Sequence, residues 1–98
     1  MTVTKTLEDK ILNVKVDGRL DTATAPELEK ELDGVLEEAE ELVFDFEGLE
    51  YMSSAGLRIL LATQKKMSAK GGMKVTNVND VISEIFEITG FSDILTIE

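Results

Sequence analysis

The sequence predicts one α/β domain over residues 1–98, in the order β-β-α-β-α-β-α with a last short strand or tail. Two observations predict it. Apolar side chains near the N-terminus alternate with polar ones, as in strands, and the later segments alternate between helical periodicity and short apolar runs. Since alternating strands and helices require parallel pairing with right-handed crossovers, we expect a mixed, mostly parallel sheet with helices packed on it.

The N-terminal residues predict a β-hairpin. The β-branched stretch Thr2–Leu7 is typical of an edge strand, and the apolar residues of 12–16 recur at every second position. Residues 8–10 form a three-residue polar link between the two strands. Residues 17–22 break the alternation and are expected to end the second strand.

A first helix is expected to begin at Thr24. Glu27 stands at the spacing of a capping box, and Pro26 is tolerated in a first turn. Gly34 should weaken this helix only slightly. One apolar stripe continues to its end: Leu28, Leu32, Val35, Leu36 and Ala39.

The second half of the chain contains two more strand–helix units. The apolar run 42–46 predicts a central strand covered on both faces, and a helix then runs from Ser53-Ser54 to about Lys70, before Gly71-Gly72. Residues 73–78 form the next strand. Asn79 or Asp80 caps a third helix that ends at Gly90, and residues 94–97 are a short strand or tail.

Composition limits the classes of partner. A net charge of −10 argues against nucleic acid and against anionic membrane surfaces. The chain has no cysteine, no apolar run long enough to span a bilayer and no signal pattern, so we expect a cytoplasmic protein. Residues 27–50 carry eleven acidic side chains and residues 58–74 five basic ones. These are either two solvated faces or faces that steer protein partners.

Two adjacent hydroxyls, Ser53 and Ser54, stand at the expected strand-to-helix junction. Free N–H groups and the positive end of the helix dipole favour a phosphate at such a place. Ser53 could simply cap the helix by accepting from the N–H of Ala55 or Gly56. Ser54 is not needed as a cap, and the small Ala55 and Gly56 beside it should leave the site open to approach.

The parallel topology predicts which other residues share this edge. Strand C-terminal ends lie along one edge of a parallel sheet, and ligand sites gather there. Asp21-Thr22, Ser53-Ser54 and the segment 77–79 should therefore converge around Ser54. We expect the Asp21 carboxylate to approach the same N–H groups that would hold a phosphate.

The residues for catalysis are missing. With no histidine or cysteine, no nucleophile elbow and no glycine-rich phosphate loop, the chain offers no catalytic residues, metal site or cofactor site. A hydrolase would need a deep pocket lined by Asp21 and the serines. A nucleotide-binding module would need base recognition, for which no pattern is visible.

The segment Gly18-Arg19-Leu20-Asp21, the run 43–46 and the stretch Tyr51–Leu57 resemble STAS domains, in particular the small bacterial anti-sigma factor antagonists. The resemblance implies that Ser54 is phosphorylated by a partner anti-sigma factor, which is a serine kinase, with Ser53 as second choice. It implies that only the unphosphorylated form binds that factor, and that a serine phosphatase restores it. It also places an acid near the site at Asp21.

Two residues depart from the family pattern. Ser53 stands where the family has an acid, and Arg58 stands where it has a second glycine. Because Arg58 is four residues after Ser54, its guanidinium could pair with a phosphate there. The alternative function is a phosphorylation-independent STAS interaction module in a sensor, stress or transporter complex. We expect a monomer when the protein is free.

Overall fold

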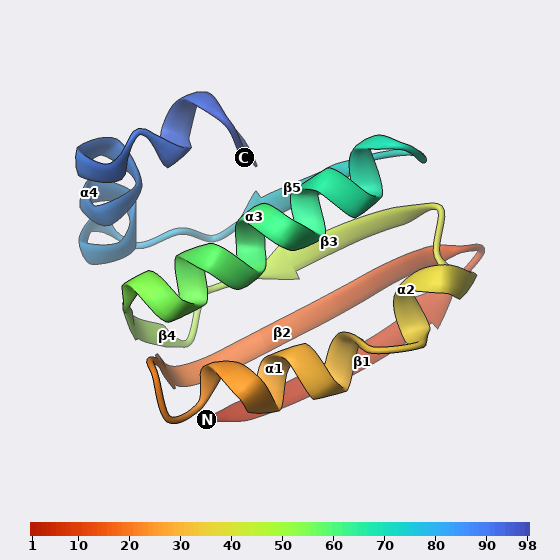
Figure 1. Cartoon of the computed structure of the whole chain (residues 1–98), viewed down its shortest axis with the longest axis horizontal. Coiled ribbons are helices and arrows are strands. Elements are labelled where there is room, and N and C mark those ends of the chain that lie inside the picture. Colours follow the sequence, from red (N-terminus) through yellow and green to blue (C-terminus); the bar gives the residue numbers. More distant parts are fainter.

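The computed structural model describes residues 1–98 and contains six strands, four α-helices and one 3-10 turn. The predicted order is confirmed, with a second short helix and an extra strand added to it. In chain order the elements are β1 (Thr2–Glu8), β2 (Ile11–Leu20), α1 (Ala25–Leu32), α2 (Val35–Glu38), β3 (Glu41–Asp45), β4 (Leu49–Met52), α3 (Ser54–Ser68), β5 (Met73–Thr76), α4 (Asp80–Thr89), η1 (Phe91–Asp93) and β6 (Thr96–Ile97) (Figure 1).

The N-terminal hairpin is confirmed, with β1 at the edge of the sheet. Glu8 pairs with Ile11, so the link has two residues and not the expected three. Asp9 and Lys10 both have positive φ, of 50° and 66°. These angles match a two-residue hairpin turn whose twist suits the flanking strands.

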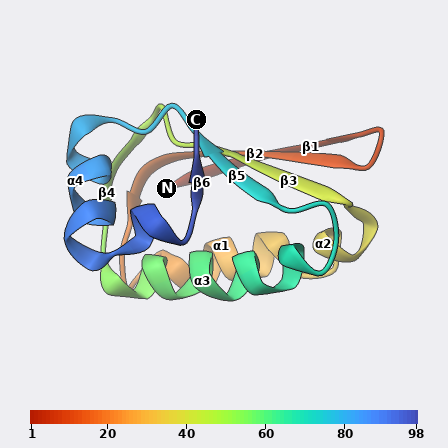
Figure 2. The same cartoon turned by 90° about the horizontal axis from the view of Figure 1, so that it is seen from above.

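The sheet has the order β1-β2-β3-β5-β6, and only the β1–β2 pair is antiparallel. Because successive crossovers step in one direction, their right-handedness puts α1 and α3 on the same face (Figure 2). The predicted cover on both faces of β3 is therefore wrong. Leu42 and Phe44 are buried under the helices, whereas Val43 and Asp45 on the other face are only half-buried.

Strand β2 runs further than its sequence indicates, through Gly18 to Leu20. Its first half pairs with β3 and its last residues pair with β4, with a register shift between Gly18 and Arg19. Gly48 stands in the turn before β4, where a side chain would collide with the Asp17 carboxylate. Strand β4 escaped prediction because its four residues show no period-two pattern: only the first and last are buried.

The first predicted helix is two helices. Asp33 is extended and Gly34 has φ 81°, which ends α1 and lets α2 begin at Val35. The expected capping box does not form, since no side chain caps α1. Thr24 instead turns its hydroxyl back toward the end of β2, where Oγ1 lies 2.8 Å from the Arg19 carbonyl oxygen.

The remaining boundaries follow the sequence closely. Helix α3 ends at Ser68, two residues before the expected Lys70. Asn79 caps α4 by accepting from the N–H of Ile82 at 2.9 Å, and Gly90 ends that helix in the left-handed conformation. The final short strand is confirmed at 96–97. None of the helices is long and apolar enough to cross a membrane.

Lys70 ties α2 to the end of α3. Its Nζ donates to the carbonyl oxygens of Leu36 at 2.6 Å and Ala39 at 2.9 Å. We expect Lys70→Met to lower the free energy of unfolding by about 1–2 kcal/mol, because it leaves partly buried carbonyls without a donor. Urea unfolding measures the loss. Lys66→Met, in the last turn of α3 and with no such bond, is the matched control, and an equal loss there would refute the role of Lys70.

Candidate functional site

The candidate site lies where β2 and β4 end side by side. Leu20 pairs with Met52, and the N–H of Ser53 donates to the Leu20 carbonyl oxygen at 2.8 Å. The loop that begins at Asp21 and the start of α3 therefore leave the sheet together. This part of the predicted convergence is confirmed.

The two serines differ sharply in exposure. Ser53 is the N-cap residue of α3, but its hydroxyl makes no capping bond, so the expected capping role is wrong. Its Oγ is buried and has no hydrogen-bond partner. Ser54 is the first helical residue and is exposed. Since no side chain caps α3, the N–H groups of its first turn stay free for an acceptor beside Ser54.

Gly56 faces the core and not the solvent. It is buried, and a Cβ there would lie 2.7 Å from Cγ of Leu20 and 2.9 Å from Cγ of Met52. The expectation that it opens the site to approach is therefore wrong. Its absent side chain lets α3 begin directly on the ends of β2 and β4. Ala55 beside it is half-buried and packs against the core.

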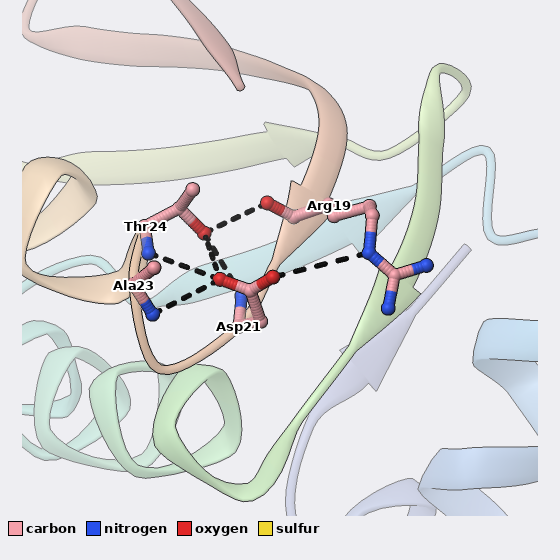
Figure 3. Close-up of polar contacts among 4 residues, drawn as sticks. All are labelled: Arg19, Asp21, Ala23 and Thr24. Atoms are coloured by element: carbon pink, nitrogen blue, oxygen red, sulfur yellow. Dashed lines mark hydrogen bonds and ion pairs between the residues drawn. The ribbon is translucent and has the colours of Figure 1, made fainter.

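The Asp21 carboxylate serves its own loop (Figure 3). Oδ1 accepts from the N–H groups of Ala23 at 3.0 Å and Thr24 at 3.1 Å, and Oδ2 lies 3.8 Å from Nε of Arg19. The backbone N–H of Thr24 is the main cause that lowers the pKa of Asp21. No hydrogen bond joins Asp21 to Ser53 or Ser54, so the predicted approach to the α3 N–H groups is not observed. Asp21 holds the loop beside Ser54 in shape.

Arg19 and Tyr51 lie in segments that carry the family resemblance, but the sequence did not indicate their contact at this site. They are paired in the β2–β4 register, and the Arg19 guanidinium carbon lies 4.6 Å from the centre of the Tyr51 ring. Their pairing could be found only once β4 was known. Arg58 is exposed and forms no ion pair, and Thr22 is exposed with no side-chain hydrogen bond.

The segment 77–79 does not join this cluster. Asn77 donates to Oδ1 of Asp45 at 3.0 Å, at the end of the β3–β5 pair, and Asn79 donates to the Leu49 carbonyl oxygen. Asp45 pairs with Lys15, five residues before Leu20 on β2. At the rise of a strand that offset is about 16 Å. The bend of β2 and the insertion of β4 thus split the predicted edge into two places.

Asp45 and Asp21 make stability depend on pH. The Asn77 amide, followed by the N–H of Glu47, lowers the pKa of Asp45 from 3.8. A lowered folded-state pKa contributes stability that is present above pH 3.8 and is lost as pH falls through the folded-state value. Carboxyl NMR titration should show that Asn77→Gly raises the pKa of Asp45 and leaves Asp21 unchanged. Thr24→Val should raise the pKa of Asp21 and leave that of Asp45 unchanged. The rise should be partial, because the backbone N–H donors to Asp21 remain.

No deep pocket lies at the serines. Two surface hollows, of about 640 and 410 Å³, are lined by other residues and do not include Asp21, Ser53 or Ser54. No group of three or more acidic side chains is arranged to hold a metal ion. The site is an exposed surface, suited to contact with a protein.

Comparison with known proteins identifies relatives along the whole chain. Residues 2–98 match the STAS domain family. The anti-sigma-B factor antagonist of Staphylococcus aureus is 33% identical over 97 residues, which are 97% of this chain and 90% of that protein. An anti-sigma factor antagonist from Mycobacterium paratuberculosis has a crystal structure with a TM-score of 0.89 and 29% identity, covering 98% of this chain and 83% of its own.

The fold also matches SpoIIAA at 15% identity. The unphosphorylated form of that anti-sigma factor antagonist gives a TM-score of 0.84 over 99% of this chain and 88% of its own. The phosphorylated form from Bacillus gives 0.76 over 99% and 91%.

Proposed function

This chain belongs to the STAS domain family, and from that premise we propose that it is an anti-sigma factor antagonist, switched by phosphorylation of Ser54. Its unphosphorylated form binds an anti-sigma factor and so frees the sigma factor. The similarity to an anti-sigma-B factor antagonist along 97% of the chain supports the antagonist function. As a binding protein and not an enzyme, it acts in the cytoplasm, where its partners and ATP are present.

The observation that carries the switch is the exposed hydroxyl of Ser54 on the first residue of an uncapped helix. A kinase can reach this oxygen, and the free N–H groups of the first turn would stabilise the phosphate that results. The Ser53 hydroxyl is buried, so phosphorylation there would require the junction to open. This difference favours Ser54 over Ser53. SpoIIAA, which shares the fold, exists in phosphorylated and unphosphorylated forms.

The switch we propose is electrostatic. A phosphate adds nearly two negative charges to a surface that must contact a partner closely. The fold need not change, because a helix start accepts an anion. Binding is lost through like-charge repulsion and the cost of burying the phosphate at the interface. Asp21, Thr22 and Ala55 beside Ser54 belong to the same contact surface.

Two enzymes act on this surface in the proposed cycle. The anti-sigma factor is itself the serine kinase that uses ATP, and a serine phosphatase returns Ser54 to its free hydroxyl. Both must read an exposed serine at a helix start. Arg58 lies close to this serine in the chain, and the loop held by Asp21 lies close to it in the fold.

Peptide mass spectrometry tests the proposal directly. The protein is incubated with ATP and the kinase-like anti-sigma factor encoded nearest to it. We expect one phosphate on Ser54, none in Ser54→Ala and an unchanged yield in Ser53→Ala. A phosphate on Ser53 would refute the assignment of the acceptor, and a stable complex without phosphate would refute the switch.

Ser54→Asp should stabilise the fold. An acid on the first turn interacts favourably with the helix dipole, and Arg58 four residues later adds an ion pair, together about 0.5–1 kcal/mol. Arg58→Ala should remove about a third of that gain. Urea unfolding of the four variants in this cycle measures both effects. Ser68→Asp, at the negative end of the α3 dipole, is the control and should not raise the free energy of unfolding.

One observation favours a second function, a phosphorylation-independent interaction module. Ser53 stands in place of the acid that precedes the phosphorylated serine in the resembled family. A kinase that requires that acid would not modify this chain. Partner binding that is equal for wild type and Ser54→Asp would establish the second function.

A further inference from the structure

A groove separates the two helix walls on the covered face of the sheet. Its volume is about 640 Å³, and residues of α1 and α2 line one side of it and residues of α3 the other. Figure 1 shows these helices lying side by side. Its floor is apolar: Ile59 is half-buried there, and Leu36 and Met67 lie buried beneath it. The small, exposed Ala62 leaves its middle open.

The two walls of this groove carry opposite charge. Glu29, Asp33 and Glu37 line the α1–α2 side, and Lys66 and Lys70 line the α3 side. All are exposed, and none of the three ion pairs in the protein crosses the groove. The uneven charge along the sequence therefore becomes two walls of opposite charge on neighbouring helices, since α1 and α3 pack against each other. Because no ion pair joins the two walls, the charge of each wall remains available to a partner. This arrangement favours faces that steer a protein partner over two separate solvated faces.

Two side chains modify this pattern without cancelling it. Lys30 also lines the acidic wall, so that wall has three acids and one base. The ammonium group of Lys70 donates to the carbonyl oxygens at the end of α2 and bounds the groove there. Glu37 lies at the same end, where its carbonyl oxygen also accepts from Lys70 at 3.3 Å. Away from that end, Glu29, Asp33 and Lys66 are the charges free to meet a ligand.

We propose that this groove binds one amphipathic helix of a protein partner, basic along the flank that meets Glu29 and Asp33 and acidic along the flank that meets Lys66. Apolar side chains of the helix would fill the floor, as in other helix-in-groove complexes. The opposed walls fix the direction of the bound helix. Turning a helix end for end on a surface exchanges its two flanks, which would place like charges together.

The groove suits a helix better than it suits a small molecule or a second copy of this chain. A small-molecule site encloses most of its ligand and orients it with free polar groups inside the pocket, not with exposed charges on its walls. The one buried polar side chain here is Thr63, which donates its hydroxyl proton to the Ile59 carbonyl oxygen at 2.8 Å. A second copy of the chain would set one concave groove against another and leave the floors of both unfilled.

Two synthetic helical peptides of identical composition test the proposal. Each has one apolar stripe, and they differ only in which flank carries lysine and which glutamate. Each bears a nitroxide at its N-terminus, which broadens nearby amide signals in the NMR spectrum of the protein. We expect both to bind, one with its label near Pro26 and the other, in the opposite direction, near Lys70.

Three variants of the protein supply the controls. Exchanging the free wall charges (Glu29→Lys, Asp33→Lys and Lys66→Glu together) should reverse the direction of both peptides. Ala62→Trp fills the groove without changing a charge and should weaken both at least tenfold. Glu84→Lys on α4 lies outside the groove and changes the net charge by the same amount as Glu29→Lys. It should change neither the direction nor the affinity of either peptide.

Four outcomes would overturn the proposal: no saturable binding of either peptide, the same direction for both, no response to the exchanged walls, or concentration-dependent dimerisation that Ala62→Trp abolishes. The last would assign the groove to a second copy. The proposal does not rest on the phosphorylation switch. Peptide binding should be equal in wild type and Ser54→Asp, so failure of one proposal leaves the other standing.

Discussion

Gly56→Val is expected to destabilise the protein by about 3 kcal/mol or more, a large part of the 5–15 kcal/mol that holds a domain of this size folded. Its Cβ would lie 2.7 Å from Cγ and 2.9 Å from Cδ2 of Leu20. Leu20 is fully buried and Met52, the other neighbour, is 2% exposed. Neither can move without opening the contact between α3 and the ends of β2 and β4. Urea unfolding measures the effect.

Gly56→Ala separates packing from helix propensity. In a helix, alanine is more favourable than glycine by about 1 kcal/mol. If Gly56→Ala still lowers the free energy of unfolding, the steric clash must cost more than that gain. A Leu20→Ala background removes the two close contacts with Leu20 and leaves only the one with Cγ of Met52, so the same substitution should cost clearly less there. Ser54→Ala, exposed in the same turn, should stay within about 0.5 kcal/mol of wild type. A loss at Gly56 that does not respond to Leu20→Ala would contradict the packing argument.

Phosphorylation of Ser54 should weaken binding of the anti-sigma factor by about 100-fold or more. Like charges brought together at an interface cost several kilocalories per mole, and about 2.7 kcal/mol corresponds to a hundredfold. Ser54→Asp carries one charge in place of nearly two and should give a smaller loss, about tenfold. Calorimetric titration of the unmodified, phosphorylated and substituted proteins gives the three dissociation constants.

Ser54→Asn is the matched control for charge. It has the shape of aspartate and no charge, so its dissociation constant should lie within about threefold of wild type. Circular dichroism and amide NMR shifts away from the first turn of α3 should be the same in all forms. Equal weakening by asparagine and aspartate would assign the effect to shape. A phosphate that rearranged the domain would contradict an electrostatic switch.

Much of the fold could be predicted because its signals are local. The hairpin and the three principal helices follow from the period of their apolar residues, and the strand at 42–46 follows from its short apolar run. The strand predicted at 73–78 is observed over Met73–Thr76. Asn79 and Gly90 mark the ends of α4 by their own chemistry. What escaped prediction depends on partners distant in the chain. Strand β4 exists because the end of β2 bends toward it, and the covered face of the sheet follows from the direction of successive crossovers.

The candidate site divides in the same way. The Ser53-Ser54 junction at the start of a helix could be read from the sequence, and so could the position of Asp21 beside it. The direction of each side chain could not. Gly56 turns inward, Asp21 turns to its own loop, and Asn77 joins Asp45 at another strand end. Arg19 and Tyr51 share the site only through a pairing between β2 and β4.

The sequence by itself determined the α/β class, the hydroxyl pair at a helix start, the absence of histidine and cysteine and the uneven charge, because each is a property of neighbouring residues. Only the tertiary structure decided which hydroxyl is accessible and that residues of the acidic and basic segments line one groove. The Ser53 hydroxyl is buried and Ser54 is exposed because the junction packs against Leu20 in one fixed orientation. Residues of the acidic and basic segments line the same groove because right-handed crossovers put both helices on one face of the sheet, an arrangement that no local pattern encodes.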